Sequence, residues 1–252
     1  MTTQSTGTSD ATIGAKFPMT IIEKLSDAGL RFISASPVEL QRRIWICVGF
    51  EEEGERLGQH PHLAFLYGGR DWLRVHDLHQ AIADEFSGAE NVLTRVHSEC
   101  LLGDAFGSTM CDCGDQMRLA MEEMESQRGG VFLYLRQEGR GIGMSNKLDA
   151  LALQYGFCQG ERKHHRHSSD EANLALGFAI DERSYNGAAG FLNALGIASV
   201  QLITGNPGKI GDLETAGIRV SSALDLWTKG GSSERATAEI EEKVARGYIY
   251  QR

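Results

Sequence analysis

The sequence predicts an α/β protein, in the wider α+β sense, with a mixed β-sheet flanked by helices. Segments rich in β-branched and aromatic residues alternate with segments whose apolar residues recur every three or four positions. Only four prolines interrupt the 252 residues, and no repeat of solenoid length is present. Strands that alternate with helices indicate a sheet covered by helices, although the strand order does not follow from one sequence.

Each predicted element rests on its own pattern. Strands are expected where β-branched and aromatic residues cluster: Ile44–Phe50, His62–Tyr67, Asn91–His97, Val131–Leu135 and Ser199–Thr204. Helices are expected where apolar residues share one helical face: Asp77–Phe86, Asp115–Ser126, Met144–Tyr155, Ala188–Leu195, Lys209–Ala216 and Ser233–Ala245. The second helix carries a methionine stripe typical of core packing, and Gly217 is a helix stop.

Composition and charge restrict the class of partner. The chain is 41% hydrophobic and 23% charged, as a soluble globular protein is. It carries 25 Lys and Arg against 34 Asp and Glu, a net charge of −9, whereas general nucleic-acid binders present basic surfaces to phosphates. We therefore expect no nucleic-acid partner. A small anionic substrate is compatible with this charge, because it needs only a local basic pocket.

The N-terminal segment does not look like a targeting signal. Residues 1–16 are rich in Thr, Ser, Gly and Ala, which predicts a disordered tail before a single domain at 17–252. The segment lacks the charged and apolar regions of a signal peptide. No apolar run reaches the ~18–20 residues of a membrane span. We expect a cytoplasmic protein with no membrane partner.

Three of the five cysteines lie within fourteen residues, as Cys100-x10-Cys111-x-Cys113. An odd number of cysteines without a secretion signal favours metal or thiol chemistry over disulfides. Zinc binds thiolates strongly, and three protein ligands leave a fourth position for water, as in catalytic zinc sites. Three unrelated buried cysteines or a redox pair are the alternatives. A thiol oxidoreductase is disfavoured, because the CxxC spacing is missing.

Polar motifs surround the cysteines and follow later predicted strands. Arg95–Glu99 precedes the first cysteine, and Arg136–Gly143 (RQEGRGIG) combines closely spaced glycines with two arginines that suit phosphate oxygens. Asp181–Arg183 and Thr204–Lys209 (TGNPGK) come later in the chain. Taken singly, each motif is better explained as a surface turn or a salt bridge.

One basic segment, Gln159–Ser169 (QGERKHHRHSS), has no apolar residue. Its composition is typical of a solvated, mobile loop. The alternative interpretation is a basic lid that closes over a polyphosphate. A second metal site is weakly supported, because adjacent histidines do not share one helix face.

Together these motifs are specific. The string RVHSECLLGDAFGSTMCDCGDQM, followed by RQEGRGIG, NK, EAN, LGF, DER and TGNPGK, resembles GTP cyclohydrolase II, the entry enzyme of riboflavin synthesis, from about Gly49 to Val220. The resemblance implies a mixed α/β fold, a homodimer, one zinc ion per subunit and Mg²⁺ bound with the triphosphate. It also implies a hydrolase that opens the imidazole ring of GTP at C8 and releases pyrophosphate.

The resemblance implies roles for individual residues. The zinc ligands are Cys100, Cys111 and Cys113. The substrate contacts are Arg95, Val96, His97, Ser98, Glu99, Gln116, Glu138, Gly139, Arg140, Ser169, Thr204 and Lys209. Asp181 matches the proton acceptor, and Arg183 matches the nucleophile toward the α-phosphate. Because a guanidinium stays protonated in proteins, we expect Arg183 to be a substrate contact. Glu171 is hypothesised to accept the guanine N1–H and amino hydrogens.

Leu151 departs from the family pattern, which usually has a tyrosine four residues beyond the lysine matching Lys147. A tyrosine hydroxyl can donate a proton or orient water, and leucine can do neither. We therefore predict that the first hydrolysis survives and that the second, which releases formate, is impaired. The product would be a formamidopyrimidine nucleotide in place of a deformylated diaminopyrimidine.

Two further departures favour a specialised member of the family. The basic segment at 159–169 is interpreted as an insertion, and Gly69–Glu90 is longer than the corresponding connection in compact members. Both are compatible with a role in secondary metabolism instead of housekeeping riboflavin biosynthesis. A non-catalytic, zinc-stabilised guanine-nucleotide-binding protein is the alternative from a different class.

Overall fold

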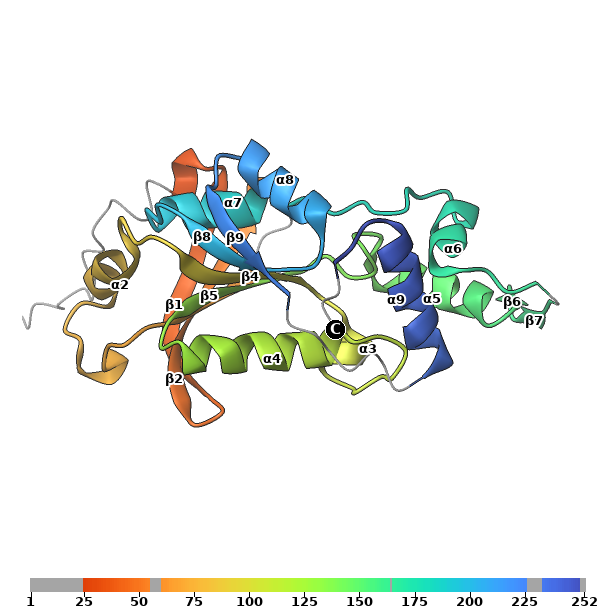
Figure 1. The fold of residues 1–252 in the computed structure, drawn as a ribbon, viewed down its shortest axis with the longest axis horizontal. Helices are drawn as coiled ribbons and strands as arrows, with labels where there is room; N and C mark the ends of the chain where they lie inside the picture. The colour runs from red at the N-terminus through yellow and green to blue at the C-terminus, as the bar shows by residue number, and fades with distance from the viewer. Residues whose placement is uncertain (1–24, 55–59, 164, 226–232, 250–252) are drawn as a thin grey trace, which may run out of the picture.

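The computed structural model describes residues 25–54, 60–163, 165–225 and 233–249, so the predicted tail at 1–16 lies outside the described residues. Its centre is a seven-stranded sheet with the strand order β1-β2-β3-β5-β4-β8-β9, seen edge-on in Figure 1. The strands are β1 (Leu30–Leu40), β2 (Arg43–Glu52), β3 (His62–Tyr67), β4 (Val92–Ser98), β5 (Gly130–Leu135), β8 (Val200–Ile203) and β9 (Val220–Leu224). The predicted mixed sheet is confirmed.

The helices lie on both faces of the sheet and beyond one of its ends (Figure 1). They are η1 (Trp72–Arg74), α2 (Leu78–Phe86), α3 (Leu101–Asp104), α4 (Cys113–Ser126), α5 (Gly143–Gln154), α6 (Ser169–Ala175), α7 (Asn186–Ala194), α8 (Pro207–Thr215) and α9 (Glu234–Ala245), with a hairpin of β6 (Phe157–Cys158) and β7 (Glu161–Arg162). All six predicted helices and five predicted strands are confirmed to within two residues at each end. Gly217, with φ +87°, follows α8 as the predicted stop.

The sheet changes direction at β5. Strands β1, β2, β3 and β5 are antiparallel neighbours, whereas β4 pairs in parallel with β5 and β8, and β8 with β9. Parallel neighbours need crossover connections, and α4 and α8 lie in two of them. Since parallel strands end at one edge, the segments after β4, β5 and β8 meet there, where α/β sheets usually bind ligands.

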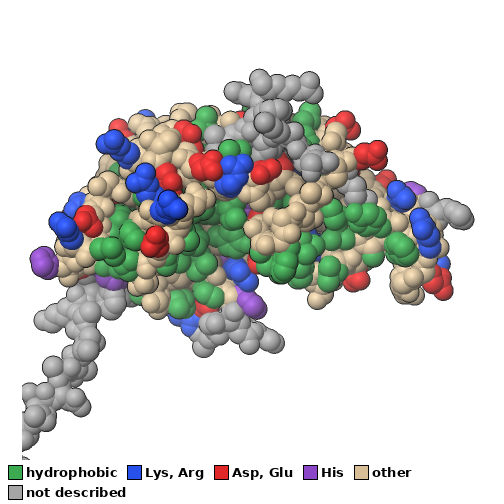
Figure 2. Space-filling model, turned by 90° about the horizontal axis from the view of Figure 1, so that it is seen from below, with side chains coloured by type: hydrophobic (Ala, Val, Ile, Leu, Met, Phe, Trp, Pro, Cys, Tyr) green, Lys and Arg blue, Asp and Glu red, His purple; other side chains and the backbone are tan. Residues whose placement is uncertain are grey.

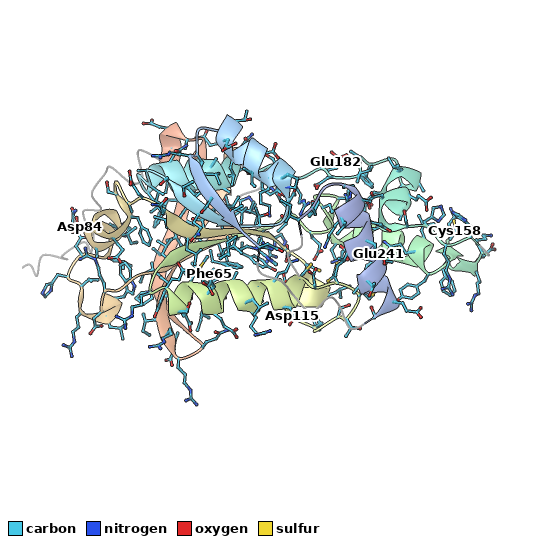
Figure 3. All side chains as sticks on the ribbon, in the orientation of Figure 1. Phe65, Asp84, Asp115, Cys158, Glu182 and Glu241 are labelled. Carbon is cyan, nitrogen blue, oxygen red and sulfur yellow. The ribbon has the colours of Figure 1, made fainter. Side chains whose placement is uncertain are left out.

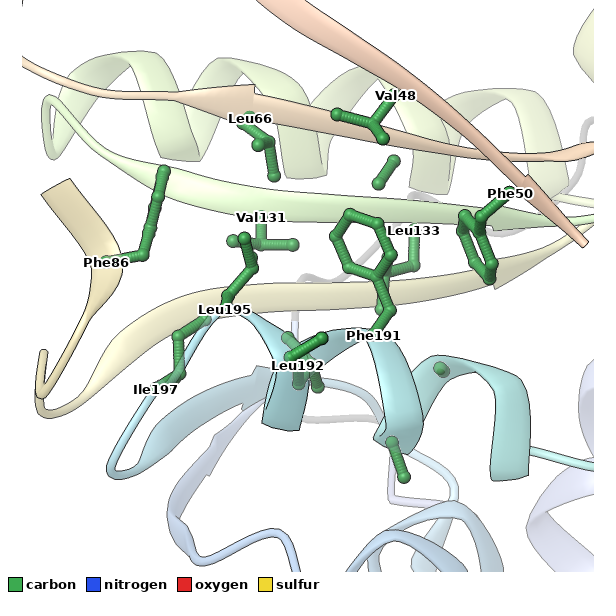
Figure 4. Packing of buried hydrophobic residues seen from close by; sticks show 14 of the residues in the cluster. Val48, Phe50, Leu66, Phe86, Val131, Leu133, Phe191, Leu192, Leu195 and Ile197 are labelled. Atoms are coloured by element: carbon green, nitrogen blue, oxygen red, sulfur yellow. The ribbon is translucent and has the colours of Figure 1, made fainter. Parts of the chain in front are cut away.

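The larger hydrophobic cluster lies between the sheet and α2, α7 and α8. Alternate residues of a strand face the same side, so β5 contributes Val131, Leu133 and Leu135 to this cluster. Figure 4 shows Val131 and Leu133 on the side of the sheet that faces Phe191 and Leu192 of α7. This packing fixes β5 and its neighbours, and thereby the positions of the loops at their carboxyl ends.

The smaller cluster lies on the opposite face, under α4. Phe132 of β5 packs there with Met121 and Met124 of α4, and Met117 is partly buried against them. The interpretation of the methionine stripe as core packing is confirmed. Because α4 begins at a cysteine, this packing also holds one of the three thiols in place.

A second group of elements lies beyond the carboxyl edge of the sheet, formed by α5, α6, α9 and the β6–β7 hairpin (Figure 1). Cys158, labelled in Figure 3, is at the outer tip of this group and is exposed, far from the sheet. Among the described residues, no helix has the length and apolar character that crossing a membrane would require.

Candidate active site

The three predicted metal ligands come together at the carboxyl end of β4. Cys100 precedes α3, and Cys113 is the first residue of α4. The Sγ atoms of Cys100 and Cys111 are 3.6 Å apart, and all three Sγ atoms lie within 4.8 Å of one another. Tetrahedral zinc with Zn–S bonds of about 2.3 Å separates its sulfurs by about 3.8 Å. This donor set therefore fits zinc, and it is the one such cluster in the described part of the chain.

A glycine makes the approach of the thiols possible. A Cβ atom added to Gly103 would lie 2.9 Å from the Sγ atom of Cys111 and 3.2 Å from that of Cys100. The first distance is shorter than real Cβ contacts and the second is tight, so a side chain at this position would displace the Cys111 thiol and press on that of Cys100. The absence of a side chain at position 103 is thus part of the metal site.

A lysine and a glutamate support the thiol cluster. The Lys147 Nζ atom is 3.2 Å from Cys100 Sγ and 2.5 Å from Glu138 Oε1. Hydrogen bonds from the other two thiols, then the Lys147 charge, hold the pKa of Cys100 well below its usual range. Burial lowers the pKa of Lys147, but the Cys100 thiolate and Glu138 outweigh burial and raise it. Lys147 is therefore protonated beside the Cys100 sulfur at neutral pH.

A cavity of about 450 Å³ opens beside the thiols, within the size range of small-molecule sites. Most of the predicted site residues line it. They are Arg95, His97, Ser98, Glu99, Cys100, Cys111, Cys113, Gln116, Glu138, Gly139, Arg140, Ser169, Arg183, Thr204 and Lys209. The predicted residues Val96, Glu171 and Asp181 do not line it.

Strand β4 provides one wall through alternate residues. The Arg95 guanidinium donates to the Ile203 carbonyl (2.9 Å) and to Gln116 Oε1 (2.6 Å), which fixes its planar group at the cavity. His97 contacts Asp104 at 3.2 Å, and burial lowers the pKa of this histidine, so that it is neutral at pH 7. Val96 faces the core on the other side of the strand, as the alternation requires.

The RQEGRGIG motif forms a tight turn after β5. Gly139 (φ +63°), Arg140 (φ +60°) and Gly141 (φ +93°) all have left-handed backbone, which glycine adopts without steric cost. The turn aims the Arg140 guanidinium at α6, where it donates to Ser169 Oγ (2.7 Å) and to Asp170 Oδ1 (2.6 Å). Two predicted substrate contacts thus lie side by side.

The TGNPGK motif carries a lysine into the cavity. Asn206 caps α8 by accepting from the Gly208 N–H (2.9 Å), and Pro207 occupies the first turn, where its missing N–H costs nothing. Lys209 then reaches back to donate to the Val96 carbonyl at 2.6 Å. Burial, followed by the nearby arginines, lowers the pKa of Lys209 well below its usual value. An anionic ligand would relieve that unfavourable environment.

Asp181 and Arg183 form an ion pair with two contacts. The Arg183 Nε atom lies 2.8 Å from Asp181 Oδ1, and a second nitrogen contacts Oδ2. Burial raises the pKa of Asp181, but Arg183 outweighs it and the net shift is downward. The pKa of Arg183 is raised, because its bond to Asp181 outweighs burial. In this state Asp181 is a weak base, and the Arg183 guanidinium is fully protonated.

Tyr185 is a residue that the sequence did not single out. Its ring lies 5.0 Å from Lys209 Nζ and 5.9 Å from the Arg183 guanidinium carbon, distances at which cations are attracted to an aromatic face. Burial raises the pKa of its hydroxyl to about 12. Tyr185 therefore holds two predicted substrate contacts together. Its only sequence signal is its place two residues after the DER motif.

The EAN motif lies on α6. Its residue in the cavity lining is Asn173, whereas the sequence predicted Glu171. Glu171 is exposed and closes a capping box with Ser168, in which its carboxylate accepts from the Ser168 N–H (2.8 Å). Glu171 does not reach the cavity, so its guanine-binding role gains no support from this position. Asn173 of the same motif is 5% exposed and lines the cavity, and it offers both a donor and an acceptor.

Two features that depart from the family pattern also reach the cavity. Leu151 lines it from α5, as its place in the motif implies. The basic segment at 159–169 is mainly exposed, as expected for a solvated loop, but its Arg166 and His167 line the cavity wall. His164 of this segment lies outside the described residues. The part of the segment nearest α6 therefore contributes to the cavity wall.

The structure is thus an α/β protein with a cavity lined by three thiols and several basic side chains. Comparison with known proteins specifies the family. The profile described as GTP cyclohydrolase II matches residues 37–225. The chain belongs to the GTP cyclohydrolase II family, a family of hydrolases.

Individual relatives agree with the family match. The chain is 40% identical over 202 residues to GTP cyclohydrolase-2 of Baumannia cicadellinicola, which covers 80% of this chain and 86% of that protein. It is 48% identical over 141 residues to GTP cyclohydrolase-2 of Neisseria meningitidis serogroup C, covering 56% and 67% of the two chains. It is 49% identical over 139 residues to the riboflavin biosynthesis protein RibBA of Bacillus subtilis, covering 55% and 33%.

Proposed function

We propose that this protein is a zinc-dependent GTP cyclohydrolase that hydrolyses the imidazole ring of GTP at C8 and releases pyrophosphate. The observation that supports this most is the position of the three thiols at one end of a cavity lined by Arg95, Arg140, Arg183 and Lys209. The cations match a triphosphate, and the thiols match zinc. Mg²⁺ would accompany the triphosphate, with one zinc ion per subunit.

Cys100, Cys111 and Cys113 would hold the zinc ion, which when bound supplies Lewis acidity toward water at neutral pH. Lys147 would stabilise the negative charge of the Cys100 thiolate, to which it already donates. Glu138 fixes that lysine and also accepts from the Leu101 N–H (2.7 Å), which holds the start of α3. These groups keep the ligand set in one geometry, as the outer partners of metal sites do.

Arg183 and Asp181 would change partners when substrate binds. A phosphate carries more negative charge than a carboxylate, so it competes well for the Arg183 guanidinium. Once Arg183 contacts phosphate, the charge that lowers the pKa of Asp181 is shared, and that pKa rises. Asp181 then becomes a better proton acceptor, and Arg183 stabilises charge on the leaving pyrophosphate. This assigns Arg183 a role that does not need a neutral guanidinium.

The presence of leucine at position 151 supports a reaction product that keeps its formyl group. Leu151 lines the cavity at the family's tyrosine position and brings no hydroxyl to it. The expected product is therefore a formamidopyrimidine nucleotide with little formate. In Leu151→Tyr, formate release should appear. Leu148→Tyr is the matched control, because Leu148 is on the same helix, 52% exposed and outside the cavity lining.

The test is incubation with GTP, Zn²⁺ and Mg²⁺, followed by pyrophosphate and formate assays and mass spectrometry of the product. Pyrophosphate release and ring opening by the wild-type protein, with ring opening lost in Cys111→Ser, are the expected results. Stoichiometric formate from the wild-type protein would refute the interpretation of Leu151 while leaving the cyclohydrolase intact. Binding of GTP without any pyrophosphate release would instead favour a zinc-stabilised guanine-nucleotide-binding protein.

A cytoplasmic homodimer with a role in riboflavin biosynthesis or a related secondary pathway completes the proposal. Hydrophobic side chains gather in patches on the face seen from below in Figure 2, with charged side chains between and around them. Patches of that kind are typical of surfaces that bury against another subunit. Sedimentation equilibrium at several concentrations would measure the oligomeric state, and a monomer throughout would contradict the dimer.

A further inference from the structure

Helix α9 forms a wall of the cavity although it follows the family-matched residues 37–225. One face of the helix lines the cavity together with the residues that come after it. The lining residues from this segment are Glu234, Ala238, Glu239, Glu242, Lys243, Arg246 and Tyr248. Positions 234, 238, 242 and 246 are four apart and lie one above another on a helix. The helix thus turns a single face to the substrate cavity.

Both ends of this segment are attached to other parts of the site. At the start, Ser233 caps the helix, and its Oγ atom donates to the Thr109 carbonyl (2.7 Å) in the loop between α3 and α4. At the end, the Ile249 N–H donates to the Gly205 carbonyl (2.8 Å) in the loop after β8. The segment therefore crosses the cavity from the loop between α3 and α4, which carries Cys111, to the TGNPGK loop after β8. Glu241, labelled in Figure 3, lies on this helix.

The contacts along α9 are mainly polar. No residue of α9 belongs to either hydrophobic cluster of the described residues, although Ala236 is buried. Lys243 Nζ lies 3.5 Å from Asp112 Oδ1, and Glu242 accepts from the Ser169 N–H at 3.4 Å. Both contacts are longer than ordinary hydrogen bonds and correspondingly weaker. A wall held by such contacts can exchange them for contacts with a ligand at small cost.

Arg246 is a cation on this wall that shares a carboxylate with Arg140, a predicted substrate contact. One of its terminal nitrogens is 3.5 Å from Asp170 Oδ1, the same oxygen that Arg140 contacts at 2.6 Å. Arg140 also contacts Ser169. Two guanidinium groups from distant segments thus converge on one carboxylate at the cavity wall, with Arg246 at the looser distance.

We propose that α9 completes the substrate cavity and that Arg246 is a further phosphate-binding residue, acting beside Arg140. The identification of GTP as the substrate rests on the proposed function, whereas the phosphate site is argued from the contacts of Arg246 alone. A phosphate group can accept two parallel hydrogen bonds from an arginine fork. It therefore competes with the longer contacts that now hold Arg246, at 3.5 Å to Asp170 and at 3.4 Å from Nε to the Glu242 carbonyl, beside the Tyr248 ring. Three other charged groups on this face already have partners: Glu239 contacts Lys243 at 3.1 Å, and Glu242 contacts Ser169.

The test compares two ligands that separate phosphate from base, inorganic tripolyphosphate and guanosine. Each is titrated by calorimetry into the zinc-loaded, full-length protein. In Arg246→Gln, the affinity for tripolyphosphate should fall about 10-fold or more, as expected for a lost charge-assisted bond, while that for guanosine changes less than about twofold. Arg219→Gln is the matched control: it removes the same charge from an exposed position outside the cavity lining.

Arg246→Lys distinguishes loss of the phosphate contact from loss of structure. It keeps the positive charge and loses only the forked geometry of the guanidinium, so it should bind tripolyphosphate with intermediate affinity. An unchanged tripolyphosphate affinity in Arg246→Gln would overturn the proposal. Equal losses for tripolyphosphate and guanosine would also overturn it, because they would show displacement of the whole helix. Failure of the wild-type protein to release pyrophosphate from GTP would refute the cyclohydrolase activity and leave this result unaffected.

Discussion

Replacement of Gly103 by alanine should weaken metal binding without harming the fold. Gly103 is inside the short helix α3, where alanine is intrinsically favoured over glycine by about 1 kcal/mol. Its backbone is not in the left-handed region, so an added methyl group causes no local strain. The whole cost must therefore come from what the methyl group meets, which is the thiol cluster.

The size of the effect follows from the distances. The added Cβ would lie 2.9 Å from Cys111 Sγ, whereas ordinary contacts begin at 3.4 Å, so this thiol must move by about 0.5 Å. Zinc sites tolerate deviations of about 0.2 Å in their ligand distances. The displacement exceeds that tolerance for at least one ligand. We expect zinc affinity to fall about 10- to 100-fold, the range seen when the supports of a metal ligand are removed.

Competition with a chromophoric chelator measures the affinity, and Co²⁺ substitution reports the coordination through its thiolate absorption bands. Gly211→Ala is the matched control, since Gly211 is inside helix α8 with open space around its Cβ position. That variant should bind zinc as the wild-type protein does. If Gly103→Ala binds zinc with unchanged affinity and an unchanged Co²⁺ spectrum, the assignment of these thiols as one compact ligand set is wrong.

Two further predictions concern the cations and the buried histidine. Tyr185→Leu removes the ring that Lys209 and Arg183 contact, so KM for GTP should rise about 3- to 10-fold. Tyr185→Phe keeps the ring, and its KM should stay near that of the wild type. Equal KM values for the two variants would exclude a role of the ring in positioning these cations. Burial lowers the pKa of His97 in the folded protein. The buried neutral imidazole therefore contributes fully to the free energy of unfolding above the unfolded-state pKa of about 6.5. This contribution is lost as the pH falls below that value, because the unfolded chain then binds a proton that the folded protein does not. Denaturant unfolding of metal-free protein at about pH 7.5 and pH 5.5 should show this loss, and a His97→Gln variant with the same pH dependence as wild type would contradict it.

Elements with strong periodicity were predictable, and those without it were not. The helices with regular apolar stripes and the strands rich in β-branched residues appear where expected, because local spacing sets which side chains share a face. Strand β1 was missed: it is an edge strand that contains Pro37, and almost all of its residues are half-exposed or exposed, so it lacks a clear alternation. Helix α6 was missed as well, although the Ser168–Glu171 capping box was a usable signal for it.

The metal cluster illustrates what residue order can determine. Cys111 and Cys113 are separated by one residue, and the loop back to Cys100 is short, so their spacing alone restricts the distances between the thiols. Short loops convert sequence spacing into spatial distance. The order of the residues alone therefore predicts the three-cysteine cluster, the glycine-rich turns of the RQEGRGIG and TGNPGK motifs, and the family resemblance.

The walls of the cavity depended on the fold. Tyr185 meets Lys209, and Arg246 meets Asp170, across separations of 24 and 76 residues, and Lys209 reaches the backbone of Val96 across 113. Contacts of this range depend on strand order and on the paths of the crossover helices, neither of which a local pattern encodes. Spacing along the chain identified the thiols that form the metal cluster. Only the packing of the sheet and of α9 placed the cations that surround the cavity beside it.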